Sequence, residues 1–328
     1  MKFLVEVRRA KKYFPVKRTF LEGLFGKKQA HVRAVDDVSL QIREGETFAL
    51  VGESGSGKTT LGKLTLAIYP LTSGHVIFDG QDVALIKGRD AQVFRRSAQM
   101  VYQDPVAALN PRITVGEAIR EPLEFNHLGS PSGQKTTALN LMKRVGLDPP
   151  EEFYGRYSHE ISGGQRQRVV IARSLVLRPR FLVADEPVAM LDVSVRAQIL
   201  KLLLDLKREM NLTILVITHD LAIAKYFADS VAIMYLGQIV EAANKDDVFK
   251  NPMHPYTKAL FSSVPIPDPT ATRARMTIQG EIPSASSPPP ACRFHTRCPF
   301  VFDRCRVEEP PLVEKSPGHY VACHLYDR

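Results

Sequence analysis

The sequence predicts an α/β fold organised around a phosphate-binding loop, and two observations carry this prediction. An apolar run of strand length at 47–51 leads directly into the stretch Gly-Glu-Ser-Gly-Ser-Gly-Lys-Thr at 52–59, and a helical pattern begins near Lys58. Further apolar runs of strand length alternate with helical patterns along the chain. Strand, loop and helix in this order match G-x-x-x-x-G-K-[ST], whereas an unrelated glycine-rich turn would share only the composition.

The residue types in this loop explain how it would hold phosphate. Glycines let the backbone curl so that successive N–H groups point inward, and the positive end of the following helix adds to the same spot. We expect Lys58 to reach the outer phosphates and the Thr59 hydroxyl to bind Mg²⁺. The predicted nucleotide ligands of the loop are Gly52, Ser54, Gly55, Gly57, Lys58, Thr59 and Thr60.

Length and composition indicate a globular protein with a sizeable core. The chain has 328 residues, of which 44% are apolar and 24% charged, enough for one large domain or two ordinary ones. The longest apolar runs have strand length, so any membrane role is expected to be peripheral. The amino terminus lacks the apolar stretch of a signal peptide, which predicts a cytoplasmic protein.

The charge balance does not select a partner. The 44 basic and 35 acidic residues give a net charge of +9, which suits nucleic acid, nucleotide phosphates or an anionic membrane. We interpret the modest basic cluster near the amino terminus as a solvated loop face; it comprises Lys11, Lys12, Lys17, Arg18, Lys27, Lys28 and Arg33.

The first part of the chain predicts two strand regions, 3–9 and 31–51, with a polar surface excursion around Gly23 and Gly26 between them. Tyr13 precedes that excursion. It is either an ordinary aromatic at a strand end or a platform on which a base stacks, and the phosphate loop favours the platform.

Residues 58–68 predict a helix, and 74–80 and 98–102 predict strands. The last strand leads into Gln103. A carboxamide at a strand end can bind Mg²⁺ and sense the outer phosphate, although by itself this glutamine would be an ordinary loop residue.

Strand character then fades, which predicts an inserted helical lobe with helices at 115–125 and 135–145. The lobe ends in Ile-Ser-Gly-Gly-Gln at 161–165, followed by an amphipathic helix at 166–177. A serine at the cap position with adjacent glycines predicts a second anion-binding helix terminus.

A buried strand at 181–184 ends in Asp185 and Glu186, and open α/β sheets hold their ligands at the carboxyl ends of strands. We expect Asp185 to anchor Mg²⁺ and Glu186 to orient or deprotonate an attacking water. The alternative is an acidic surface turn.

A loop ending in Asp192 and a helix at 194–210 lead to the buried strand 213–218, which His219 follows. A single histidine is usually structural. Its place at the same sheet edge favours a hydrogen bond to the outer phosphate. A hairpin at 231–235 and 238–241 comes next, and the Pro- and Ser-rich stretch 264–290 predicts a linker or extended arm.

All four cysteines lie near the end of the chain, which predicts one local site. Their spacing lacks the tight C-x-x-C pairs of a zinc ribbon, and four thiolates can bind Zn²⁺ or an iron–sulfur cluster. Disulfides are disfavoured in the cytoplasm, and free thiols are the remaining alternative. The thiols belong to Cys292, Cys298, Cys305 and Cys323, and His295, His319 and His324 are nearby substitutes.

These motifs together resemble the ATPase subunit of an ABC transporter of the oligopeptide/dipeptide-permease type. The resemblance covers nearly the whole chain and rests on the order and spacing of the loop 52–59, Gln103, the segment 161–165, the Asp185-Glu186 pair and His219. His-Pro-Tyr at 254–256, followed by the four cysteines, resembles the carboxyl extension of these ATPases.

The resemblance implies a P-loop NTPase of the ABC type, with a mixed sheet core, an antiparallel β subdomain and an inserted helical subdomain. Residues 1–260 would form the nucleotide-binding domain, with the helical subdomain at about 105–178, and 261–328 the Pro-rich arm and cysteine region. The implied cofactors are ATP, Mg²⁺ and a [4Fe–4S] cluster, favoured over Zn²⁺. Glu186, His219 and Lys58 would be catalytic, and Thr59, Gln103 and Asp185 would bind Mg²⁺.

The resemblance also implies partners. Two ATPase subunits, preferably paralogues, would pack head to tail, so that Ser162, Gly163, Gly164 and Gln165 face ATP held by the partner; Asp192 is a further expected nucleotide-site residue. The pair would drive two transmembrane permease subunits, supplied by an extracytoplasmic solute-binding protein, from the cytoplasmic side of the membrane. The cargo is peptides or related solutes; nickel and oligosaccharides are also carried by relatives.

One motif departs from the family pattern. Similar subunits usually have Ser-Ala-Leu-Asp where this chain has Ala189-Met190-Leu191-Asp192, so a hydroxyl expected to link the two facing sites is missing. Two alternative functions fit the motifs less well. A soluble ABC ATPase acting on DNA would generally have long coiled coils or zinc modules between its motifs, and a regulatory subunit that binds ATP without cleaving it is opposed by Glu186 and His219.

Overall fold

The computed structural model describes residues 2–16, 30–262, 276, 278 and 280–327. The chain divides into two compact units. The helical unit comprises 43–46 and 86–216, and the strand unit comprises the described residues of 2–42, 47–85 and 217–328. The predicted excursion around Gly23 and Gly26, and residues 264–275, 277 and 279 of the predicted arm, lie outside the described residues.

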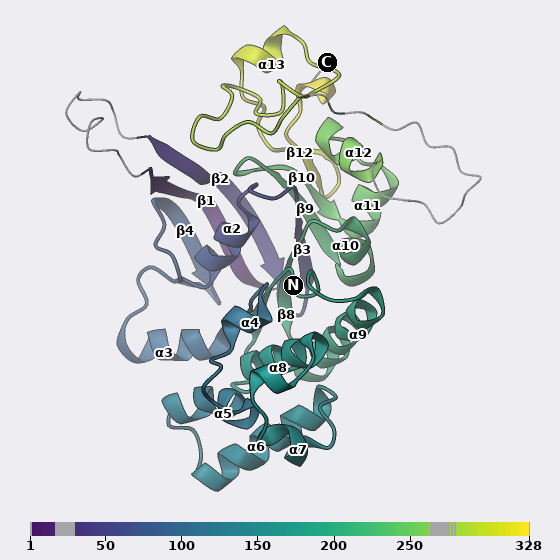
Figure 1. Ribbon diagram of the computed structural model, residues 1–328. Helices are drawn as coiled ribbons and strands as arrows, with labels where there is room; N and C mark the ends of the chain where they lie inside the picture. The colour runs from purple at the N-terminus through teal and green to yellow at the C-terminus, as the bar shows by residue number, and fades with distance from the viewer. Residues whose placement is uncertain (1, 17–29, 263–275, 277, 279, 328) are drawn as a thin grey trace, which may run out of the picture. The chain divides into compact units, whose positions relative to one another are not determined.

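The strand unit contains an antiparallel sheet of order β2-β1-β4-β5. Its strands are β2 (His31–Arg43), β1 (Phe3–Pro15), β4 (Ser73–Phe78) and β5 (Gln81–Asp82) (Figure 1). Along β2 the buried residues Val38, Leu40 and Ile42 alternate with exposed polar ones. This two-residue period places one face of the strand in the core.

A second group of strands in the same unit has the order β11-β12-β10-β9-β3. Here β3 runs parallel to β9, whereas β9 and β10 are antiparallel, so the sheet is mixed. All five residues of β3 are buried. The strands are β11 (Val313–Ser316), β12 (His319–Val321), β10 (Gln238–Asn244), β9 (Ser230–Tyr235) and β3 (Thr47–Val51).

Helices complete the strand unit. Helix α2 follows β3, and α10 packs on β3 while α11 packs on β10 and β9. The helices are α2 (Lys58–Thr65), α10 (Leu221–Phe227), α11 (Lys245–Lys250), α12 (Pro255–Ser262) and α13 (Asp303–Val307), with a 3₁₀ turn at His324–Tyr326.

The helical unit is built from parallel strands and a helical lobe. Strands β6 (Ala98–Val101) and β7 (Phe181–Asp185) are parallel, and β8 (Thr213–Thr218) contributes residues 213–216. Helices α5, α6 and α7 gather beside α8 in Figure 1. The helices are α3 (Gly88–Ser97), α4 (Pro105–Ala108), α5 (Val115–Phe125), α6 (Pro131–Arg144), α7 (Pro150–Tyr154), α8 (Gly163–Leu175) and α9 (Val193–Met210), with a 3₁₀ turn at Ser158–Glu160.

Local sequence signals fix the ends of the lobe helices. Thr114 and Glu117 form a reciprocal capping box at the start of α5, and the Ser130 hydroxyl caps α6 ahead of Pro131. Gly116 lets α5 approach α7 closely, because a Cβ at this position would lie 2.3 Å from the Tyr154 ring.

The predicted helix at 115–125 and the strand at 213–218 are confirmed with the same bounds. The single strand region predicted at 31–51 is wrong in one respect, because a turn at 44–45 separates β2 from β3. Gly45 there has φ +76, a conformation that interrupts a strand. No helix among the described residues is long and apolar enough to cross a membrane.

Candidate nucleotide-binding site

The predicted phosphate loop, residues 52–59, connects β3 to α2, which is the predicted order. Two of its glycines are required by close packing. A Cβ on Gly57, which has φ +105, would lie 2.0 Å from the Ala34 carbonyl oxygen, and one on Gly52 would lie 2.2 Å from the Met234 carbonyl oxygen. The neighbouring backbone therefore admits only glycine at both places.

Lys58 is buried within the curl of this loop. Its ammonium donates to the carbonyl oxygens of Gly52 and Glu53, each at 2.8 Å, and to the Ser56 hydroxyl at 3.3 Å. Gly57 at the N-cap of α2 has no side chain that could cap the helix, and the positive end of the helix dipole points at the loop. The loop thus combines a fixed cation with a helix terminus, which suits an anionic ligand.

Tyr13 lies on β1 and is held by its hydroxyl. The hydroxyl donates to the carboxylate of Asp36, which in turn forms a buried ion pair with Arg293. Burial and this hydrogen bond raise the pKa of Tyr13 to about 12, so the phenol stays neutral. Burial alone would raise the pKa of Asp36, but the Tyr13 hydroxyl and the Arg293 charge hold it below its ordinary value.

A tyrosine from the predicted His-Pro-Tyr motif reaches the phosphate loop. The Glu53 N–H donates to the Tyr256 hydroxyl at 2.9 Å. The buried carboxylate of Glu241 accepts from the N–H groups of Met253 and His254, each at 2.8 Å, and fixes the start of this motif. Burial lowers the pKa of His254 to about 4, so its neutral ring can accept from the Tyr256 N–H.

His219 directly follows the last residue of β8, which is its predicted place, and it is exposed. Asp220 next to it caps α10 by accepting from the Ala222 N–H at 2.8 Å. The chain therefore turns into a helix immediately after the histidine.

In the helical unit, the structure brings Gln103 and Glu186 together. The Gln103 amide donates to the Glu186 carboxylate at 3.1 Å. The register explains this contact, because Val101 of β6 pairs with Ala184 of β7 and each side chain comes two residues later. Asp185, which precedes Glu186 at the end of β7, is buried. The sequence predicted both strand ends, although it gave no signal for the direct contact.

The predicted anion-binding segment forms the start of α8. The Ser162 hydroxyl accepts from the Gln165 N–H at 3.3 Å, and the Gln165 side chain accepts from the Ser162 N–H at 2.9 Å, which makes a capping box. A Cβ on Gly164 would lie 2.7 Å from the side chain of Val195 in α9. Asp192 is the N-cap residue of α9 and is exposed.

The four cysteines belong to one small carboxyl-terminal segment and form no disulfide. The Cys292 N–H donates to the Cys305 carbonyl at 3.2 Å. Burial, and to a smaller extent the charges of Cys305, Cys323 and Cys298, raise the pKa of Cys292 to about 12. Among the described residues, however, no group of three or more His, Cys, Asp or Glu side chains has the arrangement of a metal site.

The three histidines near the cysteines have other partners. His319 bonds to Glu241 at 2.8 Å, His324 to Asp327 at 3.2 Å, and His295 to the Cys292 carbonyl at 2.7 Å. These hydrogen bonds hold the carboxyl-terminal segment together.

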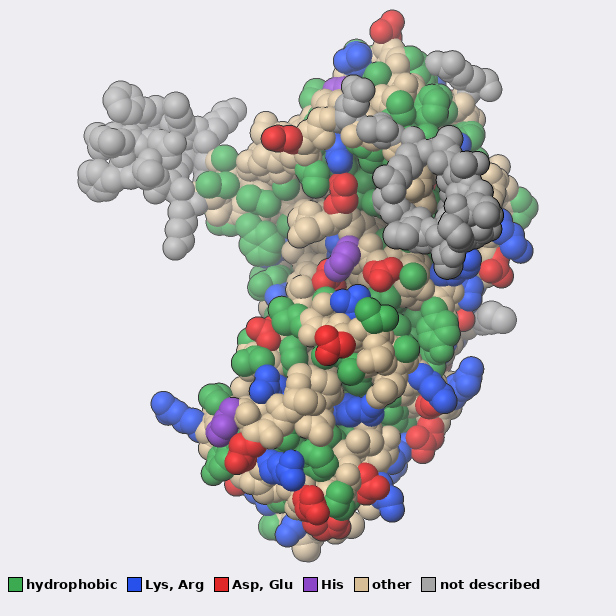
Figure 2. All heavy atoms as spheres, turned by 45° about the vertical axis from the view of Figure 1, so that its right-hand side comes forward, with side chains coloured by type: hydrophobic (Ala, Val, Ile, Leu, Met, Phe, Trp, Pro, Cys, Tyr) green, Lys and Arg blue, Asp and Glu red, His purple; other side chains and the backbone are tan. Residues whose placement is uncertain are grey.

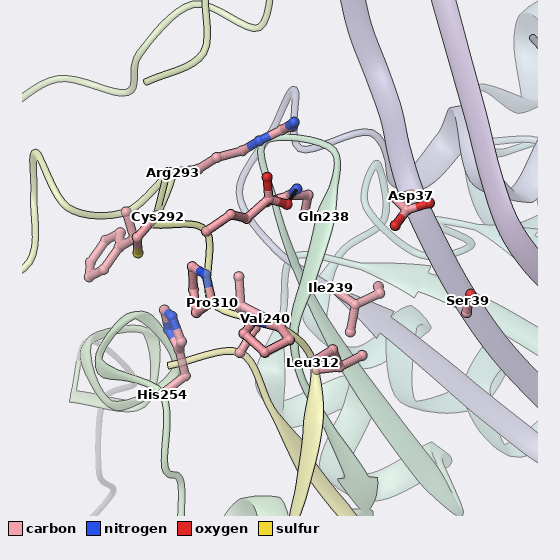
Figure 3. Close-up of a pocket in the computed structure, with 14 residues that line it drawn as sticks. Asp37, Ser39, Gln238, Ile239, Val240, His254, Cys292, Arg293, Pro310 and Leu312 are labelled. Carbon is pink, nitrogen blue, oxygen red and sulfur yellow. Dashed lines mark hydrogen bonds between the residues drawn. The ribbon is translucent and has the colours of Figure 1, made fainter. Parts of the chain in front are cut away.

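Two features of the surface were not predicted. A pocket of about 400 Å³ lies between β2, β10 and the carboxyl-terminal segment, and Figure 3 shows His254, Cys292 and Arg293 among its lining residues. On the face drawn in Figure 2, described Lys and Arg side chains are interspersed with Asp and Glu side chains.

Comparison with protein families gives two matches. Residues 35–189 match the family described as ABC transporter, and residues 240–305 match the carboxyl-terminal region of oligopeptide/dipeptide transporters. The second match extends as far as Cys305.

Comparison with curated proteins gives similarity over nearly the whole chain. The chain is 45% identical to the oligopeptide transport ATP-binding protein AppF of Bacillus subtilis (strain 168), over 98% of this chain and 97% of that protein. It is 47% identical to the putative oligopeptide transport ATP-binding protein YkfD of the same organism, over 98% and 95%. A probable peptide ABC transporter ATP-binding protein of Sinorhizobium fredii, y4tS, is 45% identical over 98% and 90%.

Solved structures share the fold. A dimeric, post-hydrolysis structure of the ATP-binding cassette MJ0796 bound to ADP and Pi aligns with a TM-score of 0.64 at 28% identity, covering 74% of this chain and 98% of that one. The cbiO1 protein of Clostridium perfringens, part of the transporter complex cbiONQ, aligns with a TM-score of 0.63 at 26% identity, covering 76% and 92%.

Proposed function

Because the chain belongs to the ABC transporter family, in its oligopeptide/dipeptide branch, we propose that it is the ATP-hydrolysing subunit that powers peptide import. The observation that carries this conclusion is the 45–47% identity, over nearly the full length, to proteins described as oligopeptide transport ATP-binding proteins. The phosphate loop between β3 and α2 supplies the chemistry that such a subunit needs.

In the strand unit, the proposed roles follow the two ends of ATP. Lys58 binds the outer phosphates, the Thr59 hydroxyl binds Mg²⁺, and the Tyr13 ring stacks on the base. The fixed Tyr13 hydroxyl supports the last role, because a stacking platform requires a defined ring orientation. His219 is proposed to hydrogen-bond the outer phosphate.

In the helical unit, Asp185 is proposed as a Mg²⁺ ligand with Gln103, and Glu186 as the group that orients or deprotonates the attacking water. The hydrogen bond from Gln103 to Glu186 supports a shared role of the two residues in hydrolysis, since a carboxylate that turns toward water would release the amide. When bound, Mg²⁺ would neutralise charge that develops on the phosphates.

The segment 161–165 is proposed to act on ATP bound by a second ATPase subunit. Ser162 and Gly163 are exposed at the start of α8, which leaves this helix end accessible to a partner's nucleotide. The structural relatives described as dimeric support a paired arrangement.

The further proposed partners are two permease subunits and a solute-binding protein, with this chain on the cytoplasmic side of the membrane. The missing hydroxyl at Ala189 predicts weaker coupling between the paired ATP sites.

Replacing Glu186 with Gln tests the assigned chemistry in the assembled transporter. Binding of ATP should persist, while turnover should fall by about 10²–10⁴-fold because the general base is lost. Glu209→Gln is the matched control, because this carboxylate belongs to the same unit, is exposed and pairs with Arg144 at the surface. Equal turnover in Glu186→Gln and the control would remove Glu186 from its role, and loss of ATP binding would assign it to binding instead.

For the carboxyl-terminal segment, we propose that the four cysteines hold a [4Fe–4S] cluster, with Zn²⁺ as the alternative occupant. Their thiols are not paired in disulfides, and a backbone hydrogen bond from the Cys292 N–H to the Cys305 carbonyl brings two of the four residues side by side. Four thiolates are a suitable donor set for either group. The bound group would tie together the segments that carry Cys292, Cys298, Cys305 and Cys323.

Purification without oxygen tests the cysteine proposal. A brown protein that contains iron and acid-labile sulfide is expected, and serine at Cys305 should abolish the colour. One equivalent of zinc in a colourless protein would establish the alternative, and a protein with neither metal would refute both. Ala285→Ser, which introduces a serine away from the four cysteines, is the control and should leave the metal content unchanged.

A further inference from the structure

Two buried arginines lie on the loop between Cys292 and Cys298. The side chains of Arg293 and Arg297 are 6% and 8% exposed. A guanidinium is costly to bury unless it is paired. Both arginines pair with residues distant in sequence: Glu53 lies in the phosphate loop, and Asp36 holds the hydroxyl of Tyr13.

Arg297 pairs with the phosphate loop itself. Its two terminal nitrogens donate to the two carboxylate oxygens of Glu53, at 3.0 and 3.3 Å, and one of them lies 3.4 Å from the Tyr235 hydroxyl. A bidentate pair of this kind fixes direction as well as charge. Together with the bond from the Glu53 N–H to Tyr256, it holds Glu53 by both its backbone and its side chain.

The charge of this pair has a consequence for phosphate binding. Glu53 places a carboxylate in a loop that is proposed to bind a polyanion, and like charges at short range repel. Arg297 neutralises that carboxylate by forming an ion pair with it. Without Arg297, the loop would present a negative charge together with Lys58.

Arg293 acts at the other end of the site. It pairs with Asp36, the residue that accepts the Tyr13 hydroxyl, and it also donates to the Leu236 carbonyl. Figure 3 shows Arg293 extending from the segment beside Cys292 toward the start of β10, where Gln238 is labelled. Arg293 therefore fixes the side chain that fixes the proposed base platform.

We propose that Arg293 and Arg297 are positioning residues through which the carboxyl-terminal segment sets the affinity of the ATP site. Arg293 acts at the base end through Asp36 and Tyr13, and Arg297 acts at the phosphate end through Glu53. This inference rests on the proposed roles of Tyr13 and the phosphate loop.

The test measures binding of ATP and of inorganic tripolyphosphate to the full chain, by competition with a fluorescent nucleotide. Arg297→Met should weaken both ligands about tenfold, since it removes a charge-assisted pair beside the phosphates. Arg293→Met should weaken ATP about fivefold and leave tripolyphosphate unchanged, because only ATP has a base to stack. A general loss of structure would weaken both ligands in both variants and would overturn the proposal.

A matched control and a rescue sharpen the result. Arg304→Met removes an exposed arginine of the same segment, which pairs with Glu308, and it should bind both ligands as the wild type does. Adding Glu53→Gln to Arg297→Met should restore most of the lost affinity, because it removes the unneutralised carboxylate. Absence of rescue would overturn the role of Arg297.

Two further variants cover other outcomes. If Arg297→Met does not fold, as judged by thermal unfolding, Arg297→Lys decides the question: a loss of two- to fivefold for both ligands supports the proposal, and wild-type binding refutes it. Lys58→Ala separates this inference from the proposed function. If it abolishes ATP binding while the arginine variants bind normally, only the positioning roles fail; if it binds ATP normally, the proposed site itself fails.

Discussion

Replacing Asp36 with Asn should strongly destabilise the strand unit, although the two side chains have nearly the same size. Asp36 is 8% exposed and faces Arg293, which is 6% exposed. Lys11 and Arg33 also approach its carboxylate, at 3.9 and 3.8 Å, and Tyr13 donates to it. Asparagine keeps the shape and an acceptor oxygen but leaves the buried guanidinium without a countercharge.

The magnitude follows from how far each pair is buried. Removing one partner of a buried ion pair costs about 3–5 kcal/mol. The pairs with Lys11 and Arg33 are more exposed and add less than about 1 kcal/mol each. At roughly 2–4 °C per kcal/mol, loss of the buried pair alone should lower the midpoint of thermal unfolding by about 6–20 °C.

Thermal unfolding of the full chain, followed by circular dichroism, measures this shift, and hydrogen exchange on β1 and β2 locates it. Asp37→Asn is the matched control. Asp37 is the next residue and pairs with Arg9, which is 79% exposed, so the control should cost less than about 1 kcal/mol. Asn also tolerates the φ of +61 at this position. Equal midpoints for the two variants would refute the reasoning.

Three other changes test the same physical arguments. The pKa of Asp36 is held below its ordinary value, so the stability that Asp36 contributes should be complete above about pH 5 and be lost as the pH falls through the lowered pKa. The difference in unfolding free energy between wild type and Asp36→Asn should therefore shrink below about pH 4. A difference that grows there would contradict this reasoning. Gly57→Ala should weaken ATP binding more than tenfold in calorimetry because its Cβ meets the Ala34 backbone, whereas Gly80→Ala, which shares a positive φ with no atom within 4 Å, should bind normally. Gly116→Ala should destabilise the helical unit by about 1–3 kcal/mol in chemical unfolding, since its Cβ would overlap the Tyr154 ring, and the same cost at the unobstructed Gly155 would point to another cause.

Local patterns predicted the elements well where one signal dominated. The strand 213–218 is fully buried, so its apolar run has no competing interpretation. The helix 115–125 has a capping box at its start and an apolar face toward the lobe. The break between β2 and β3 was missed because Glu44 and Gly45 interrupt an otherwise continuous strand pattern by only two residues.

The candidate site divides in the same way. The phosphate loop, the cap at Ser162 and the strand ends at Gln103 and Glu186 each carry a local pattern, and the structure has them on the predicted elements. Arg293 carries no such pattern, since a single arginine beside a cysteine resembles any surface arginine. Its partner Asp36 is 257 residues away in sequence, and only the fold brings them together.

The turn between β9 and β10 connects the phosphate loop to the strand that carries Asp36. Gly237 donates its N–H to the Ser56 carbonyl of the phosphate loop at 2.8 Å, and its carbonyl accepts from the Asp36 N–H at 2.8 Å. A Cβ there would lie 2.7 Å from the Arg33 carbonyl oxygen, so the close approach of the two segments requires glycine in this turn. Arg293 fixes the same turn through the Leu236 carbonyl. The backbone of one peptide turn thus contacts the phosphate loop, the segment of Asp36 and the carboxyl-terminal arginine, and sequence patterns around 52–59 give no sign of these contacts.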